Sequence, residues 1–142
     1  MATTEGLTIR PFEAGDRAAV IALWRACGLV VPHNDPETDI DRAAGRANSD
    51  VLVGVTADGR VAASVMVGHD GHRGWLYYVA VAADARGRGH GRAIVAAAEA
   101  WLRAREVPKA QFLIRDTNAA VRDFYAGLGW DESPRIVMER RL

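Results

Sequence analysis

Hydrophobic and polar positions change their period several times along the chain, and each change predicts a new element. Short β-rich runs predict strands at 7–12, 51–55, 61–68, 75–81, 110–115 and 135–142. The Asp58-Gly59 pair between the second and third runs predicts a hairpin turn. The run 75–81 is apolar throughout, which is typical of a central strand, whereas the charged run 135–142 is typical of an edge strand.

Apolar residues at helical spacing predict helices between these strands. The first is capped by Asp16 and ends at Gly28, and the second covers 34–47 with Pro36 at its start. Ile94, Val95, Ala98, Trp101 and Leu102 form one face of a third helix, and Val121, Phe124 and Leu128 mark a fourth that ends at Gly129. Together, the runs predict one mixed α/β sheet with helices on its faces.

Length and composition restrict the classes of protein that this chain can be. Its 142 residues predict one domain over 1–142, and 49% hydrophobic with 25% charged residues are typical of a globular protein. A net charge of zero argues against a general nucleic-acid surface. The lone Cys27 excludes an internal disulfide and a Cys-rich metal site. The lack of an apolar run near ~18 residues predicts no membrane partner and a cytoplasmic location.

The stretch DARGRGHGRA at 84–93 places three glycines among arginines, directly after a strand and before a helix. Glycines allow close backbone approach, and a helix N-terminus offers free N–H donors to an anion. A phosphate-binding loop and a solvated basic turn both fit this pattern. It is neither a Walker loop nor a dinucleotide fingerprint, because the Lys-Ser/Thr ending and the third glycine at the required spacing are missing.

Two motifs favour the phosphate-binding loop over the solvated basic turn. Arg86-x-x-Gly89-x-Gly91 after a buried strand resembles the pyrophosphate loop of the GNAT superfamily of acetyl-CoA-dependent N-acetyltransferases. Asn118, followed by Phe124-Tyr125 and Leu128-Gly129-Trp130, resembles the distal motif of the same superfamily. The segments NDPETDI at 34–40 and HDGHRGWLYY at 69–78 also resemble the uncharacterised bacterial YpeA subgroup. The resemblance implies a mainly antiparallel central sheet with helices on both faces.

The resemblance also implies a role for each matched position. The strand before the loop carries a bulge in this superfamily and splays from the next strand, so that its end binds the pantetheine arm. The residues expected to contact acetyl-CoA are Val79, Ala80 and Val81 at that strand end, Arg86, Gly87, Arg88, Gly89, His90, Gly91 and Arg92 in the loop, and Asn118. Tyr125 is expected to protonate the departing CoA sulfur. Ala83 departs from the pattern, since many relatives carry Pro there.

The general base and the acceptor site are less defined. Some relatives carry Glu five residues before the Asn, but here that residue is Leu113, so this base cannot be assigned. The candidates for the acceptor side are Asn34, Asp35, Glu37, Asp70 and His72. The first three are equally explained by a helix cap and first-turn acids, and the last two by a tight turn. Tyr77 and Tyr78 alternate along their strand, which predicts one in the core and one in the cleft.

The sequence therefore predicts an N-acetyltransferase that moves the acetyl group of acetyl-CoA to a primary amine by direct transfer in a ternary complex. The acceptor can be a small molecule, a peptide or a protein, and no metal is expected. The alternative is a non-catalytic acyl-CoA-binding module, which the missing base favours and Tyr125 opposes. A homodimer is possible, because 135–142 could extend a sheet across two copies.

Overall fold

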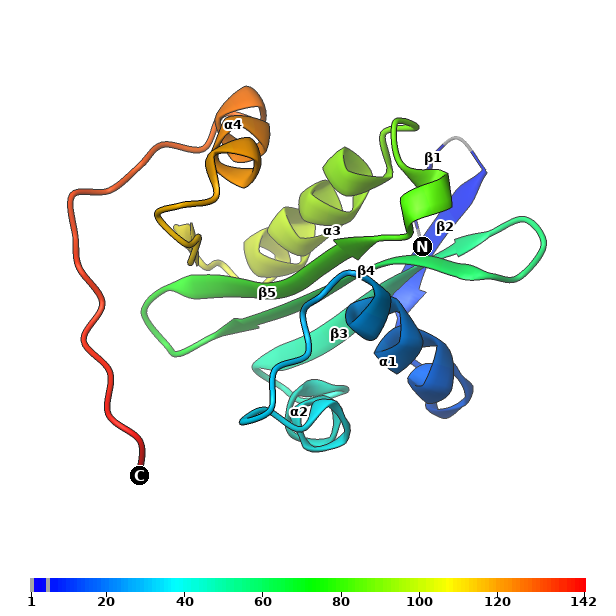
Figure 1. Ribbon diagram of the computed structural model, residues 1–142, viewed down its shortest axis with the longest axis horizontal. Helices are drawn as coiled ribbons and strands as arrows, with labels where there is room; N and C mark the ends of the chain where they lie inside the picture. The colour runs from blue at the N-terminus through cyan, green and yellow to red at the C-terminus, as the bar shows by residue number, and fades with distance from the viewer. Residues whose placement is uncertain (1, 5) are drawn as a thin grey trace.

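The computed structural model describes residues 2–4 and 6–142 and contains a six-stranded sheet in the order β1-β2-β3-β4-β5-β6 (Figure 1). The strands are β1 (Ala2–Thr4), β2 (Leu7–Pro11), β3 (Ser49–Thr56), β4 (Val61–His69), β5 (Gly74–Val81) and β6 (Ala110–Phe112). The helices are α1 (Arg17–Ala26), α2 (Pro36–Ala43), α3 (His90–Ala104) and α4 (Ala119–Gly127), with 3₁₀ turns at Ala14–Asp16 and Ala83–Ala85.

Helices cover both faces of the sheet, and neighbouring strands are antiparallel except for the parallel pair β5–β6. The expected mixed, mainly antiparallel α/β sheet is thus confirmed. On one face, Ile94, Val95 and Leu102 of α3 pack with β4 and β5. On the other face, Trp24 of α1 and Ile40 of α2 pack against β3. Figure 1 shows α3 and α4 on one side of the sheet and α1 and α2 on the other.

The start of α2 is as predicted, whereas the start of α1 is not. Asp35 caps α2 by accepting the Glu37 N–H at 3.2 Å, and Pro36 is the first helical residue. The helix ends at Ala43, earlier than the predicted 47. The Asp16 side chain does not cap α1. It accepts the Glu13 N–H at 2.7 Å and pairs with Arg10 at 2.7 Å, so that it ties the end of β2 to the helix.

The two ends of the sheet differ from the prediction. β1 was not predicted, because three residues are too few for a periodic pattern. The buried strand predicted at 110–115 is reduced to Ala110–Phe112, all half-buried. The edge strand predicted at 135–142 is wrong: this segment forms no strand and is exposed throughout. A strand needs a partner for its backbone groups, and Figure 1 shows the segment running beside the molecule, away from the sheet.

No helix among residues 2–4 and 6–142 has both the length and the apolar character that crossing a membrane requires. In the same residues, no group of three or more His, Cys, Asp or Glu side chains gathers as a metal site would.

Candidate active site

A bulge near the end of β5 shapes the site. Ser64 of β4 pairs with Ala80 and Met66 pairs with Tyr77, so β5 carries an extra residue between these pairs. Tyr78 lies at this bulge with a φ of 50°, a backbone conformation that a residue with a side chain adopts only under strain. The sequence predicted one of Tyr77 and Tyr78 in the core and one in the cleft: Tyr78 packs on the core beside Trp24 and Tyr77 is 44% exposed. The alternation across the strand behind that prediction does not hold, because both line the same pocket beside α2.

Buried hydrogen bonds hold this strained backbone in place. The fully buried Ser64 hydroxyl accepts the Trp24 Nε1–H at 2.8 Å and donates to the Tyr78 carbonyl at 2.9 Å. The Tyr78 ring stacks on the Trp24 indole, with centroids 3.8 Å apart. Its hydroxyl donates to Asp39 Oδ2 of α2 at 2.6 Å. Burial, followed by the bond to Asp39, raises the pKa of the Tyr78 phenol. α1, α2 and β4 thus jointly fix the bulge.

Beyond the bulge, one edge of β5 is open. β6 pairs with β5 only from Gly74 to Leu76, and no other described strand lies on that side. The opposite edge continues to pair with β4 as far as Val81. The backbone from Tyr77 to Val81 therefore presents groups that an extended ligand can pair with, as an added strand does.

The glycine loop follows at the end of this edge. Gly87 and Gly89 both have φ of 79°, and no atom lies within 4 Å of where a Cβ would stand. Gly89 is the N-cap residue of the 15-residue helix α3. Within the described chain, the backbone N–H groups from Arg86 to Arg92 donate no hydrogen bond. The loop thus offers unpaired donors at a helix N-terminus, where the helix dipole favours an anion.

Helix α4 closes the far side of the loop. A Cβ on Gly91 would lie 3.1 Å from Phe124 Cζ and 3.8 Å from Val81 Cγ2, so this glycine lets α4, the loop and β5 meet closely. Tyr125 is 4% exposed and packs between Phe112 and Trp130, with ring centroids at 4.4 and 5.6 Å. Burial raises the pKa of the Tyr125 phenol. Its hydroxyl has no hydrogen-bond partner among the described residues.

A pocket of about 470 Å³ lies on the other side of the bulge. Tyr77 and Tyr78 form its β5 wall, and Asp39 and Arg42 of α2 bring one carboxylate and one guanidinium. The remaining lining residues are Leu29, Asn34, Ala43, Ser49 and Met66. This pocket and the open edge of β5 thus share the strand end that carries the bulge.

Comparison with known proteins decides the family. Residues 17–130 match the family model described as acetyltransferase (GNAT) family. An acetyltransferase of Pectobacterium atrosepticum is 40% identical over 136 residues, covering 96% of each chain, and one of Yersinia enterocolitica is 38% identical over the same length. The chain belongs to the GNAT acetyltransferase family. Its structure is also similar to that of AAC(6′)-Iy, solved in complex with a CoA bisubstrate analogue, with a TM-score of 0.81, 16% identity, and 96% of this chain and 98% of the other covered.

Within this GNAT chain, the residues expected from the sequence to contact acetyl-CoA lie at the loop, at the β5 end and at the start of α4. His90 is 4% exposed, and its buried Nδ1 has no hydrogen-bond partner among the described residues. Buried polar atoms normally have such a partner, so the loop contains one further group that a ligand could hydrogen-bond. Arg86, Arg88 and Arg92 are all exposed, and Arg86 donates from Nε to the Val81 carbonyl at 3.3 Å. Asn118 caps α4 through its side-chain oxygen, which accepts the Val121 N–H at 3.2 Å, and its amide nitrogen has no partner among the described residues.

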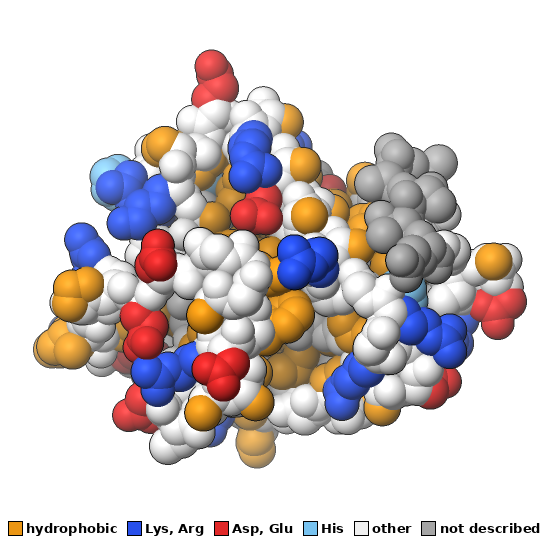
Figure 2. All heavy atoms as spheres, turned by 90° about the horizontal axis from the view of Figure 1, so that it is seen from above, with side chains coloured by type: hydrophobic (Ala, Val, Ile, Leu, Met, Phe, Trp, Pro, Cys, Tyr) orange, Lys and Arg blue, Asp and Glu red, His pale blue; other side chains and the backbone are white. Residues whose placement is uncertain are grey.

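Figure 2 views the molecule from the side on which α4 and the start of α3 lie. Apolar side chains gather in the middle of that face, and both basic and acidic side chains project around them.

Most acceptor-side residues proposed from the sequence have structural partners. Asp35 accepts the Thr38 hydroxyl at 2.8 Å, and this bond lowers its pKa. Glu37 pairs with Arg17 at 3.0 Å. Asp70 accepts the N–H groups of Arg73 and His72 at 2.8 and 2.9 Å, which lower its pKa, so it shapes a tight turn.

Of the other two acceptor-side candidates, one lies in the pocket. Asn34 lines it beside Tyr77, whereas exposed His72 is not among the lining residues. The pocket also contains residues that sequence reasoning missed. Asp39 lies midway through α2. The sequence has acidic residues at 35, 37, 39 and 41, and nothing in this pattern separates Asp39 from acids exposed on a helix surface. Arg42 has no ion-pair partner among the described residues. Only the docking of α2 against the bulge distinguishes Asp39 and Arg42 from their neighbours.

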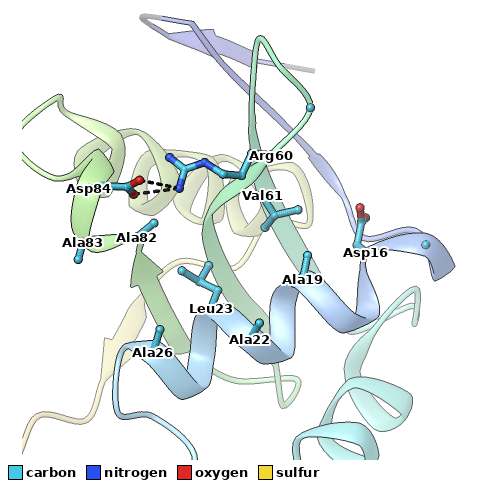
Figure 3. Close-up of a pocket in the computed structure, with 12 residues that line it drawn as sticks. Asp16, Ala19, Ala22, Leu23, Ala26, Arg60, Val61, Ala82, Ala83 and Asp84 are labelled. Carbon is cyan, nitrogen blue, oxygen red and sulfur yellow. Dashed lines mark hydrogen bonds and ion pairs between the residues drawn. The ribbon is translucent and has the colours of Figure 1, made fainter.

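A larger hollow of about 580 Å³ lies between α1, the β3–β4 turn and the residues before the loop (Figure 3). Alanines of α1 and of 82–83 line it, and Leu23 and Val61 point into it. Its charged groups are already paired, Arg60 with Asp84 at 2.9 Å and Asp16 with Arg10. It therefore offers no free acid or base, and we assign it no chemistry.

Proposed function

We propose that this GNAT protein transfers the acetyl group of acetyl-CoA to a primary amine, directly within a ternary complex. The observation that carries the proposal is the shared strand end, where the open β5 edge lies on one side and the Tyr77–Tyr78 pocket on the other. A thioester held along the edge and an amine held in the pocket would meet there. Such positioning supplies much of the rate of a two-substrate reaction.

In the proposed complex, the unpaired N–H groups from Arg86 to Arg92 hold the pyrophosphate. Val79, Ala80 and Val81 pair with the pantetheine amides, and Asn118 contacts the arm from the α4 side. Their support is the open edge and the absence of competing hydrogen bonds at the loop in the described chain. No residue is proposed to hold the adenosine end of acetyl-CoA.

The chemical step forms one bond and breaks another. The amine nitrogen attacks the thioester carbonyl carbon, a C–N bond forms, and the C–S bond breaks as the thiolate leaves. Cys27 is not the nucleophile of this proposal. Its sulfur lies 3.5 Å from the Val81 carbonyl and 3.8 Å from Arg86 on the α1 side, so it serves to tie the loop base to α1.

Tyr125 is the proposed partner of the departing sulfur. A thiol pKa near ~8.5 already lies below that of a free phenol near ~10. Burial raises the Tyr125 pKa further, so full proton transfer to the thiolate is uphill. The contribution is then a hydrogen bond to the charge that develops on sulfur. A neutral hydroxyl that bonds no other described residue is suited to this role.

Asp39 is the proposed binding group for the acceptor. Tyr78 holds one of its oxygens, and the carboxylate lines the pocket, where it can accept an ammonium or amine N–H. Keeping a lysine amine neutral at pH 7 costs about 4.6 kcal/mol, but an α-amine costs only about 1 kcal/mol. We therefore propose a low-pKa amine, whose proton is released through the open pocket or to Asp39.

An amine panel tests this function. The purified chain is incubated with acetyl-CoA and with lysine side-chain, α-amino and aromatic amines, each with and without a neighbouring carboxylate, because Arg42 lines the pocket too. Free thiol and product mass are measured. We expect turnover with at least one low-pKa amine. Tight acetyl-CoA binding without turnover across the panel would instead support the non-catalytic acyl-CoA-binding module.

A pair of aspartate variants tests the acceptor pocket. Asp39→Asn removes the charge that faces the pocket, and Asp41→Asn removes one that pairs with Arg17 at 2.7 Å on the other side of α2. We expect Asp39→Asn to raise KM for the amine by at least ~10-fold without changing acetyl-CoA affinity, since hydrogen bonds to charged groups contribute about 1.5–3 kcal/mol. Equal effects of the two variants would contradict the assignment.

A further inference from the structure

The charged side chains of α2 lie on two different sides of the helix. Glu37 and Asp41, four residues apart, both pair with Arg17 of α1, at 3.0 and 2.7 Å. Asp39 and Arg42, three residues apart, line the pocket of about 470 Å³ instead. Residues three or four apart lie on the same side of a helix. α2 therefore presents two carboxylates to α1, and one carboxylate with one guanidinium to the pocket.

Asp39 and Arg42 do not neutralise each other. An aspartate and an arginine at this spacing can form an ion pair on a helix surface, but no ion pair joins these two in the described chain. The Asp39 carboxylate accepts the Tyr78 hydroxyl at 2.6 Å instead. The Arg42 guanidinium is exposed and makes no hydrogen bond to another described residue, unlike Arg46, which donates to the Asp41 carbonyl at 2.6 Å. Both charges are thus available to a ligand in the pocket.

The rest of the pocket wall is uncharged. Among the described residues that line it, Arg42 is the only cation and Asp39 the only anion. Leu29 and Met66 are half-buried and supply apolar surface between the helix and the sheet. The pocket is therefore neutral overall but contains two separated charges. Complementarity favours a ligand with the same two features.

We infer that the acceptor is an amine that also carries a carboxylate a few bonds away, as a free amino acid does. The inference rests on the proposed acetyl transfer and names the class of its acceptor. Arg42 binds the carboxylate, because the N–H donors of a guanidinium match two carboxylate oxygens. Asp39 accepts an N–H of the amine, next to the strand end proposed to hold the thioester. Three helical residues rise about 4.5 Å, a separation that one small molecule can span.

The same two charges select against other amines. A diamine or polyamine places its second cation against Arg42, and such like-charge contacts are unfavourable. A peptide N-terminus has an amide where a free amino acid has its carboxylate, so it leaves the guanidinium without an anion. A phosphate monoester carries nearly two negative charges, but the pocket offers it one cation beside Asp39. A single carboxylate balances the pocket best.

Arg42 also favours release of the amine for attack. In a free amino acid, the carboxylate stabilises the neighbouring ammonium, because an opposite charge favours the charged form. Pairing of that carboxylate with Arg42 weakens this stabilisation. The nitrogen then forms the C–N bond and the C–S bond breaks, while the amine proton leaves to solvent or to Asp39. The products are an N-acetylated amino acid and free CoA.

Pairs of acids and amides test the inference. The purified chain is incubated with acetyl-CoA and with natural α-amino acids or β-alanine, each beside its carboxamide, which lacks the negative charge. We expect kcat/KM for at least one acid to exceed that for its amide by at least ~10-fold, as for a hydrogen bond to a charged group. The amine of the amide is the easier one to deprotonate, so intrinsic reactivity works against this result.

Substitutions of Arg42 separate binding of the carboxylate from a structural role. Arg42→Gln removes the charge and should bring the ratio of acid to amide close to one by raising KM for the acid. Arg42→Lys keeps the charge and should retain most of the preference. Arg46→Gln is the control, because Arg46 does not line the pocket, and should leave the ratio unchanged. Equal losses on acid and amide in Arg42→Gln would contradict the inference.

The inference and the proposed function fail in different ways. Acetylation of the amides as efficiently as the acids would overturn the inference and leave the proposed function intact. If no amine is acetylated, the proposed function fails, and calorimetric titration with the same acids and amides in the presence of CoA decides the inference. Binding of an acid that Arg42→Gln abolishes would then support it. Equal binding of acids and amides, or binding of neither, would overturn it.

Discussion

At the scale of single residues, the account depends on the side chains of Ser64 and Tyr125. Ser64 joins Trp24 to the Tyr78 carbonyl and so holds the backbone at its φ of 50°. The Tyr125 side chain is 4% exposed, and its hydroxyl makes no hydrogen bond to a described residue, which leaves it free to bond a ligand. Each makes a separate prediction.

Tyr125→Phe removes one hydroxyl and little volume. Because the hydroxyl is proposed to stabilise the departing thiolate, we expect kcat to fall about 10²–10³-fold, as for the loss of one oxyanion donor. Calorimetry should give an unchanged acetyl-CoA Kd. Tyr77→Phe is the comparison variant: Tyr77 lines the acceptor pocket, so its loss should change KM for the amine more than kcat. An unchanged kcat in Tyr125→Phe would contradict the assignment.

Ser64→Ala leaves the buried Trp24 Nε1–H and the Tyr78 carbonyl without their partner. We expect a loss of about 1–3 kcal/mol in the free energy of unfolding, the usual cost of an unsatisfied buried group. Activity should fall as well, since the bulge relaxes. Urea unfolding and steady-state rates measure the two effects. Exposed Ser133→Ala is the control, and equal stability of both variants would show that the network does not hold the bulge.

At the scale of elements, the β5 end, the glycine loop and α3 follow one another and form one unit. Its free backbone N–H groups lie in the loop, next to the N-terminus of α3, where the helix dipole is positive. Gly89 is the N-cap residue of α3, and its φ of 79° sets the direction in which the loop enters the helix. Gly59 in the β3–β4 turn has a similar left-handed backbone, with a φ of 86°, so the same substitution can be compared at both glycines.

Gly89→Ala and Gly59→Ala impose the same kind of strain at two places. A side chain in the left-handed region costs about 1–2 kcal/mol, so both variants should lose stability by a similar amount. Only Gly89→Ala should weaken acetyl-CoA binding, by at least ~10-fold, because it distorts the N–H cradle. Thermal unfolding and calorimetric titration measure the two effects. Equal acetyl-CoA affinities would remove the loop from the binding site.

Sequence patterns predicted the order of strand, glycine loop and helix, but not the contacts around them. Gly89 could be recognised as a loop residue because its φ of 79° is a property of the local backbone. The acceptor side was not predictable in the same way. Asp39 becomes distinct from Glu37 only once α2 docks on Tyr78, and the bulge that turns Tyr77 and Tyr78 to one side breaks the alternation on which strand prediction rests. The segment 135–142 has a strand pattern, but no described strand pairs with it.

At the scale of the whole molecule, alkaline pH should act through the buried phenols. Burial raises the pKa values of Tyr78 and Tyr125 above the unfolded value near ~10. The folded chain therefore keeps these protons longer than the unfolded chain. The stability they contribute is fully present below pH ~10 and is lost as pH rises through the folded pKa.

Urea unfolding from pH 7 to pH 11 measures this dependence. We expect a stability that is nearly constant to about pH 9.5 and then declines. Tyr125→Phe should decline less steeply, since it lacks one of the phenols whose pKa is raised. A wild-type decline that begins near pH 8, or identical slopes in the two proteins, would show that these tyrosines do not control the alkaline limb.

The central claim is that the glycine loop and the open β5 edge bind acetyl-CoA. Calorimetric titration of the purified chain with acetyl-CoA, beside ATP and NAD, tests it most directly. The account predicts selective binding with a Kd of ~1–100 μM, or about −5.5 to −8 kcal/mol, from phosphate and pantetheine contacts together. Absence of binding at ~1 mM acetyl-CoA, or equal binding of all three ligands, would contradict it.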